Sequence, residues 1–194
     1  LVGSEMCIRD RAMVARITSG ATPVEALYYN KDKIGRGEGR FLAAFNTPMQ
    51  VTDERYFDIR EALHCFDPYL EANRRTKNPV FHASLNPAPE DRLTNDELRQ
   101  IAREYMERMG YGAQPCFVFL HEDIERRHIH IVSLRVGLDG RKLAHDFEAR
   151  RSREILDALE RHYGLRPAAE GDAKQTYDTL SLSLIHISEP TRLA

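Results

Sequence analysis

The strongest constraint on the fold is a short segment that holds three histidines, His121, His128 and His130. The residues on either side of it, 117–120 and 129–136, are rich in β-branched and aromatic side chains, which favour strands. The mostly polar residues between them predict a turn, so the segment should form a hairpin with His121 opposite His128. Side chains alternate between the faces of a strand, and cross-strand neighbours lie about 5 Å apart. We therefore expect the three imidazoles to share one face and to bind one metal ion.

The alternate positions of this hairpin are apolar and should face a covering layer of helices. Around the hairpin, capping residues and apolar periodicity predict several further elements. The chain therefore predicts an α+β fold, in which an antiparallel sheet has helices on one face and the three-histidine metal site on its open face. The apolar residues of the hairpin are Val118, Leu120, Ile129 and Ile131; the expected helices begin at Thr22 and span 53–66, 94–110 and 147–163, and the expected strands outside the hairpin are 13–19, 40–45 and 80–85.

The composition fits one globular domain: 194 residues, of which 42% are hydrophobic and 30% charged. No apolar run approaches the roughly 20 residues that a membrane helix needs, and no signal peptide is visible. We therefore expect a soluble, cytoplasmic protein that does not contact a membrane. The three cysteines are odd in number, which argues against a disulfide framework, and they lack the spacing of metal ligands, which argues against a zinc finger.

The formal net charge of −2 gives no overall support for nucleic-acid binding. Basic residues are nonetheless concentrated in two places, one at and after the histidine hairpin and one before the strand at 80–85. Such clusters are often only solvated, but these two flank the candidate site and predict a local DNA-binding track. Its expected members are Arg126, Arg127 and Arg135 in the first cluster, and Arg74, Arg75 and Lys77 in the second.

The two ends of the chain resemble translated sequencing-adapter DNA. The segments concerned are Leu1 to Arg11 and Ser181 to Ala194, and we leave both out of the fold prediction. We expect the natural start at Met13 and a missing natural C-terminus. The predicted organisation is an artefactual tail at 1–12, one folded domain at 13–165, a linker at 166–180 and a second artefactual tail at 181–194.

The pattern His-x-Asp-x4-His-x-His, which begins at His121, resembles the three-histidine motif of HUH endonucleases, in particular the relaxase (mobilisation nuclease) family. Residues 26–30 (ALYYN) are similar to the family motif that supplies the nucleophilic tyrosine, and they place Tyr29, followed by Asn30, at that position. Residues 81–85 (FHASL) resemble the second family motif. One departure is the sequence NPAPE at 86–90, where the family commonly has a Pro-Gly-Glu turn.

The resemblance implies an enzyme that nicks and rejoins one DNA strand at an origin of transfer, through a covalent 5′-phosphotyrosine at Tyr29, for mobilisation of a plasmid or mobile element. Asp123 would orient a histidine ligand, and Asn30, His82 and Ser84 would contact DNA. The implied partners are single-stranded DNA and an accessory mobilisation protein. The family implies turnover with Mg²⁺ or Mn²⁺, whereas imidazole ligands by themselves favour Zn²⁺ or another transition metal, which leaves the ion open.

Helical geometry separates the two adjacent tyrosines. Val24, Leu27 and Tyr28 follow helical spacing and should face the core, whereas Tyr29 lies about 100° around the helix and should face the metal. Two other functions stay open. A rolling-circle replication initiator has similar chemistry, but its tyrosine generally follows the histidines. A non-catalytic, metal-stabilised module that binds single-stranded DNA is the other alternative.

Overall fold

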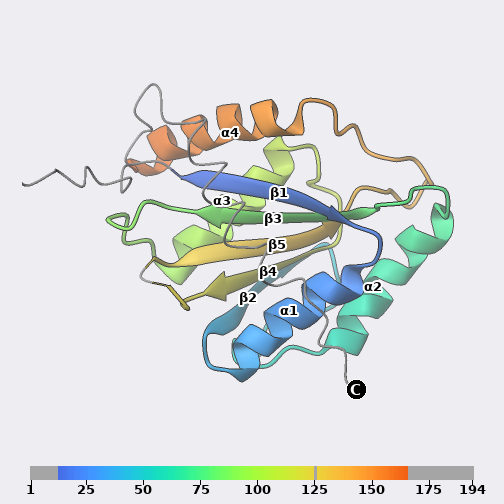
Figure 1. Ribbon diagram of the computed structural model, residues 1–194, viewed down its shortest axis with the longest axis horizontal. Coiled ribbons are helices and arrows are strands. Elements are labelled where there is room, and N and C mark those ends of the chain that lie inside the picture. The colour runs from blue at the N-terminus through green and yellow to red at the C-terminus, as the bar shows by residue number, and fades with distance from the viewer. Residues whose placement is uncertain (1–12, 125, 166–194) are drawn as a thin grey trace, which may run out of the picture.

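The computed structural model describes residues 13–124 and 126–165, which form a five-stranded antiparallel sheet with four helices (Figure 1). The strand order across the sheet is β1-β3-β5-β4-β2. The predicted α+β class and antiparallel sheet are therefore confirmed, while both tails and the expected linker lie outside the described residues. In chain order the elements are β1 (Val14–Gly20), α1 (Pro23–Gly35), β2 (Gly39–Phe45), α2 (Ile59–Ala72), β3 (Val80–Asn86), α3 (Asn95–Arg108), β4 (Cys116–His121), β5 (His128–Leu134) and α4 (Glu148–Tyr163).

The histidine hairpin has the predicted register. His121 on β4 pairs with His128 on β5, and the pairing continues without interruption to Cys116 and Ser133. The alternate apolar residues of the hairpin face α3 and α4 and are fully buried with them. This larger of the two core clusters includes Val118, Leu120, Ile129 and Ile131 of the hairpin, Leu98, Ile101, Ala102 and Tyr105 of α3, and Ile155, Leu156 and Leu159 of α4.

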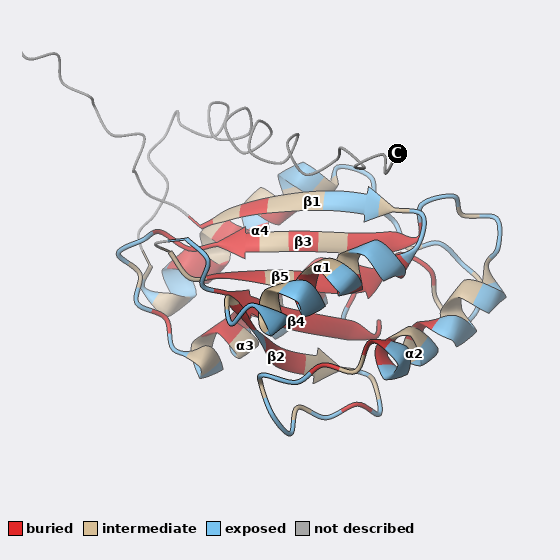
Figure 2. Cartoon of the chain, turned by 60° about the horizontal axis from the view of Figure 1, so that its bottom comes forward, coloured by how far each residue is buried: buried red, intermediate tan, exposed pale blue. Residues whose placement is uncertain are grey.

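Helices cover both faces of the sheet, so the expectation of helices on one face only is wrong. Phe117 and Phe119 on β4 and Val132 and Leu134 on β5 share the face of the histidines, and they pack in a second core cluster with residues of α1 and α2. Figure 2 shows α1 crossing in front of the central strands. The physical reason is that β4 and β5 are apolar at nearly every position, and strands of this kind need cover on both faces. The histidines lie where this second layer ends, beside the hairpin turn.

Helix α1 turns a different side to the sheet from the one predicted. Thr22 caps it by accepting a hydrogen bond from the amide of Val24, and Pro23 occupies its first turn. Its buried residues are Pro23, Leu27 and Asn30. Val24 is 38% exposed and Tyr28 54% exposed, so the prediction that both face the core is wrong. Leu27 belongs to both the predicted and the observed buried side of α1. The sequence pattern does not reveal that the polar Asn30 is buried.

Helix α2 begins later and ends later than predicted. Asp53 accepts a hydrogen bond from the amide of Arg55 in a local turn, and Asp58 caps the helix by accepting from the amides of Arg60 and Glu61. The helix then continues through Pro68, beyond the expected end at residue 66. The other two helices match their predicted positions: Thr94 and Glu97 form a capping box at α3, and a left-handed Gly164 ends α4. No helix in the described ranges is long and apolar enough to span a membrane.

Arg135 lies inside the domain rather than on a DNA-binding surface. Its side chain is 3% exposed and forms an ion pair with Glu148 of α4, with Nη2 2.7 Å from Oε2. Its Nη1 donates to the hydroxyl of Ser19 and to the carbonyl of Val80, so one guanidinium joins α4, β1 and β3. Glu148 also accepts from the hydroxyl of Tyr111. The expected role of Arg135 in DNA binding is contradicted by this burial, because these intramolecular contacts already use its donors.

Loss of this guanidinium should destabilise the fold. The substitution Arg135→Ala would leave the half-buried carboxylate of Glu148 without its cation and the hydroxyl of Ser19 and carbonyl of Val80 without their donor, and we expect the free energy of unfolding to fall by about 1–3 kcal/mol. The double variant Arg135→Met/Glu148→Gln should recover part of this loss, because it removes both charges. Urea unfolding followed by circular dichroism measures both effects. A single variant as stable as the parent chain would show that the ion pair does not hold α4 in place.

Candidate metal centre

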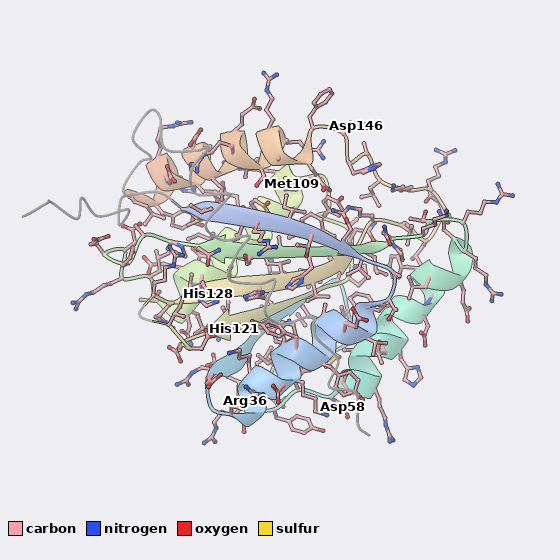
Figure 3. The ribbon with its side chains drawn as sticks, in the orientation of Figure 1. Arg36, Asp58, Met109, His121, His128 and Asp146 are labelled. Atoms are coloured by element: carbon pink, nitrogen blue, oxygen red, sulfur yellow. The ribbon has the colours of Figure 1, made fainter. Side chains whose placement is uncertain are left out.

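The three histidines of the hairpin converge at the turn end of the sheet, where Figure 3 labels His121 and His128. One candidate ligand nitrogen from each of His121, His128 and His130 lies within 4.8 Å of the other two. The ring centroids are 4.2 Å apart for His121 and His130, and 5.2–5.3 Å apart for the other two pairs. The predicted convergence of the three rings is confirmed. The site is less open than expected, because His121 is fully buried and His128 is 7% exposed.

His121 has one ring nitrogen engaged and one without a partner. Its Nε2 lies 2.8 Å from Oδ1 of Asn30, which comes from α1. Its Nδ1 is buried and forms no hydrogen bond within the described part of the chain. A buried polar atom without a partner is destabilising by about 1–3 kcal/mol, and metal coordination would remove that penalty. This nitrogen is the observation that best fits the cluster to a bound ion.

The other two rings are also held at one nitrogen. Nδ1 of His128 lies 3.3 Å from the carbonyl oxygen of Arg126, and Nδ1 of His130 lies 3.0 Å from Nε2 of His82 on the neighbouring strand β3. Each ring therefore keeps its Nε2 free of these contacts. Metal-binding histidines commonly have their second nitrogen fixed in this way, which sets the orientation of the ring. Three imidazoles fit a divalent transition metal by ligand type, and the arrangement does not identify the ion.

Burial keeps these imidazoles in the neutral form that binds metal. Desolvation is the largest cause in each case: it lowers the pKa of His121 to about 3 and that of His82 to about 4. It also lowers the pKa of His128, and it lowers that of His130 well below its ordinary value. Bound protons therefore do not compete with a metal ion at neutral pH.

Tyr29 is the aromatic residue that α1 places against the cluster. Its ring centroid lies 5.5 Å from that of His121 and 5.7 Å from that of His130. Burial raises the pKa of the phenol, while the ammonium of Lys33, one helical turn further along α1, acts in the opposite direction. Tyr28, the preceding residue, is exposed. The prediction that Tyr29 faces the site agrees with this geometry, although the reason given for Tyr28 was wrong.

Asp123 contacts a lysine rather than a histidine. Its Oδ2 accepts from Lys33 Nζ at 2.8 Å, whereas its Oδ1 lies 3.8 Å from His128 Nε2, too far for a hydrogen bond. Burial is the largest single influence on Asp123 and opposes its ionisation, but the hydrogen bond and the charge of Lys33, together with smaller contributions, outweigh it and lower the pKa of the carboxyl. Lys33 also pairs with Glu38. We did not predict Lys33, although its position one helical turn after Tyr29 was a usable signal.

The residues expected to bind DNA divide into those near the cluster and those away from it. His82 and Ser84 lie on β3 beside β5, where Ser84 pairs with His130. Arg126 is half-buried next to His128, and within residues 13–124 and 126–165 its guanidinium forms no ion pair. Asn30 is fully buried, which contradicts its expected contact with DNA.

The remaining basic residues are not brought to the site. Arg127 contacts the carboxylate of Glu122, the carbonyl of Leu93 and the side chain of Asn95, so its position is structural. Arg74, Arg75 and Lys77 are exposed but precede Val80, which pairs with Leu134 at the far end of β5. Seven strand residues, about 20 Å, separate that end from His128. Sequence clustering of charge did not show which end of the sheet each cluster occupies.

Comparison with known proteins identifies the family. The family model of the MobA/VirD2-like relaxase nuclease domain matches residues 42–165, more than half of the chain, and the chain therefore belongs to this family. Membership implies a nuclease that acts on single-stranded DNA with a divalent metal ion. The match contains the histidine hairpin and begins after α1, so it does not extend to Tyr29.

The other comparisons add little. A solved structure described as "Molecular Basis of Vancomycin Resistance Transfer in Staphylococcus aureus" aligns with a TM-score of 0.48 and 11% identity, over 82% of this chain and 99% of that chain. A likeness at this level says nothing about chemistry. No match was found among curated proteins.

The buried neutral histidines should make the metal-free fold sensitive to mild acid. Above about pH 6.5 the imidazoles are neutral in both the folded and the unfolded chain. Below this pH the unfolded chain binds protons at its histidines, whereas the folded chain excludes them until the pH approaches the lowered pKa, which is about 3 for His121. Stability should therefore fall as the pH drops from 6.5 towards 4, by up to about 1.4 kcal/mol per pH unit for each such group.

Urea unfolding in chelator at pH 7, 6 and 5 measures this dependence. The variant His121→Asn should show a shallower dependence on pH than the parent chain. The matched control is His64→Asn, the same substitution at an 81% exposed side chain on α2 away from the cluster. Equal slopes in all three proteins would contradict the assignment.

Proposed function

We propose that this chain nicks and rejoins one DNA strand at an origin of transfer, with Tyr29 as the nucleophile, during mobilisation of a plasmid or mobile element. The observation that carries the proposal is the position of the Tyr29 ring, 5.5 and 5.7 Å from the rings of His121 and His130, in a chain of the relaxase family. A tyrosine that precedes the histidines in the chain also favours a relaxase over a rolling-circle initiator.

The proposed reaction is a transesterification. The phenolic oxygen of Tyr29 attacks the scissile phosphorus, the bond from phosphorus to the 3′ oxygen breaks, and the 3′ hydroxyl leaves with a proton. Energy of the phosphodiester bond is kept in the 5′-phosphotyrosine, which permits the reverse reaction to rejoin the strand. A phenol is a weak nucleophile when neutral, and burial raises the pKa of Tyr29 further, so its ionisation needs assistance from positive charge nearby.

Two positive sources lie within reach of that phenol. His121, His128 and His130 would hold a divalent ion, which, when bound, polarises a non-bridging phosphate oxygen and stabilises developing negative charge. Mg²⁺ or Mn²⁺ is the proposed ion for turnover, and the imidazole set also admits Zn²⁺. The ammonium of Lys33 opposes the rise that burial causes in the pKa of Tyr29, and it is held by Asp123 and Glu38, so the proposed role of Asp123 is to place Lys33.

The substrate is proposed to be single-stranded DNA lying over β3 next to the cluster. Ser84, which pairs with His130 across β3 and β5, and the half-buried Arg126, two residues before His128, are the proposed contacts to DNA in the described part of the site. An accessory mobilisation protein that presents the origin of transfer remains part of the proposal.

Substitution of the two tyrosines should separate their roles. With a labelled single-stranded oligonucleotide library and Mn²⁺, we expect a covalent protein–DNA adduct in the parent chain and in Tyr28→Phe, and none in Tyr29→Phe. The reason is that Tyr29 lies against the histidines while Tyr28 is exposed. Gel electrophoresis after denaturation detects the adduct, and peptide mapping locates it.

The matched pair of variants also distinguishes the alternatives. DNA binding without an adduct in every protein, including the parent chain, would support a non-catalytic binding module. An adduct on Tyr28, or an undiminished adduct in Tyr29→Phe, would overturn the assignment of the nucleophile.

A further inference from the structure

The side-chain amide of Asn30 is buried between α1 and β4 and contacts a candidate metal ligand. Asn30 and His121 are both fully buried. Nδ2 of Asn30 donates to the carbonyl oxygen of Ala26 at 2.7 Å, within the same helix, and Oδ1 lies 2.8 Å from Nε2 of His121. The amide therefore has one contact to its own helix and one to the sheet.

The contact with Ala26 fixes which way the amide points. A carbonyl oxygen only accepts hydrogen bonds, so the group that faces Ala26 must be the NH₂ of Asn30, and the oxygen must face His121. This oxygen in turn requires a donor, so Nε2 of His121 carries the proton. A neutral imidazole has one N–H, which leaves a lone pair on Nδ1, the buried nitrogen that forms no hydrogen bond in the described ranges.

We propose that Asn30 is a positioning residue, which holds His121 in the Nε2–H tautomer so that Nδ1 is its metal ligand. Asn30 directly follows Tyr29, whose ring packs against His121 and His130. The hydrogen bond therefore ties the helix that carries the nucleophile to the metal ligand, and it sets the distance between them. This second consequence rests on the proposed function, whereas the tautomer and the metal ligand do not.

The test measures metal binding without DNA. The probe is Co²⁺, followed by its d–d absorption and by calorimetry, with the folded full chain in each case. Asn30→Ala and Asn30→Leu remove the acceptor and should weaken Co²⁺ binding about 10–100-fold, the usual effect of losing such a partner. Leu retains much of the buried volume and serves where the smaller side chain unfolds the protein. Asn30→Asp keeps an acceptor for Nε2–H, and in its protonated form it also keeps a donor to the carbonyl of Ala26, so it should bind Co²⁺ within a few-fold of the parent chain.

Two further measurements separate positioning from general stability. Asn73, whose amide bridges the end of α2 to the carbonyl of Gly140, is the control: Asn73→Ala should lower the melting temperature and leave Co²⁺ affinity unchanged. Nitrogen-15 NMR of the metal-free chain reads the tautomer directly, and the Nε2–H form of His121 should be present in the parent chain and lost in Asn30→Leu.

The outcomes are distinct from those of the nicking assay. Losses of less than about fivefold in both Ala and Leu variants, an Asp variant as weak as Leu, or an Nδ1–H tautomer in the parent chain would each overturn the proposal. The Asn30 variants should also be made in a Tyr29→Phe background, which lacks the proposed nucleophile. There they should show the same losses of Co²⁺ affinity as in the parent chain. Normal Co²⁺ behaviour without any DNA adduct would therefore refute nicking while leaving the role of Asn30 intact.

Discussion

The register of the β4–β5 pairing is the constraint on which the site depends. A slip by one residue would turn every side chain of one strand to the opposite face. Here both faces of the hairpin are packed, with Val118 and Ile131 under α3 and α4, and Phe117 and Val132 under α1 and α2. A slip would therefore move polar imidazoles into an apolar core with no partner. Core packing on two sides thus fixes His121 opposite His128, and the metal centre follows from that pairing.

The site lies where the layer of helices ends and the sheet becomes open. Helix α1 contributes a buried residue and a half-buried residue to it. Consecutive residues on a helix point about 100° apart, so Asn30 enters the core while Tyr29 stays half-buried beside the rings. Lys33, one turn later, reaches the carboxylate of the hairpin loop at Asp123. Burial makes each of these polar contacts stronger than it would be in water, and it keeps the imidazoles neutral.

Local pattern was enough to predict the hairpin register, the histidine cluster and the capping box of α3. It failed where a polar residue is buried by a distant partner: Asn30 contacts a residue 91 positions away, and Arg135 contacts one 116 positions away. Periodicity records only local neighbours, so it assigned the wrong side of α1 and placed Arg135 on the surface. The predicted start of α2 was wrong for a different reason. Asp53 and Asp58 are both plausible N-cap residues, but Asp53 accepts a hydrogen bond within a turn and Asp58 caps the helix.

Under the proposed function, the balance of charge in the site would couple metal binding to substrate binding. With the histidines neutral, the groups that act on them and on Tyr29 are the cations Lys33 and Arg126 and the carboxylates Asp123 and Glu38, which cancel. A phosphodiester and an ionised phenol bring one negative charge each, and nothing in that balanced set offsets them. A divalent ion would supply the two positive charges that match both. Because the chain as a whole carries a net charge of −2, this local match, rather than a basic surface, is what would bring DNA to Tyr29.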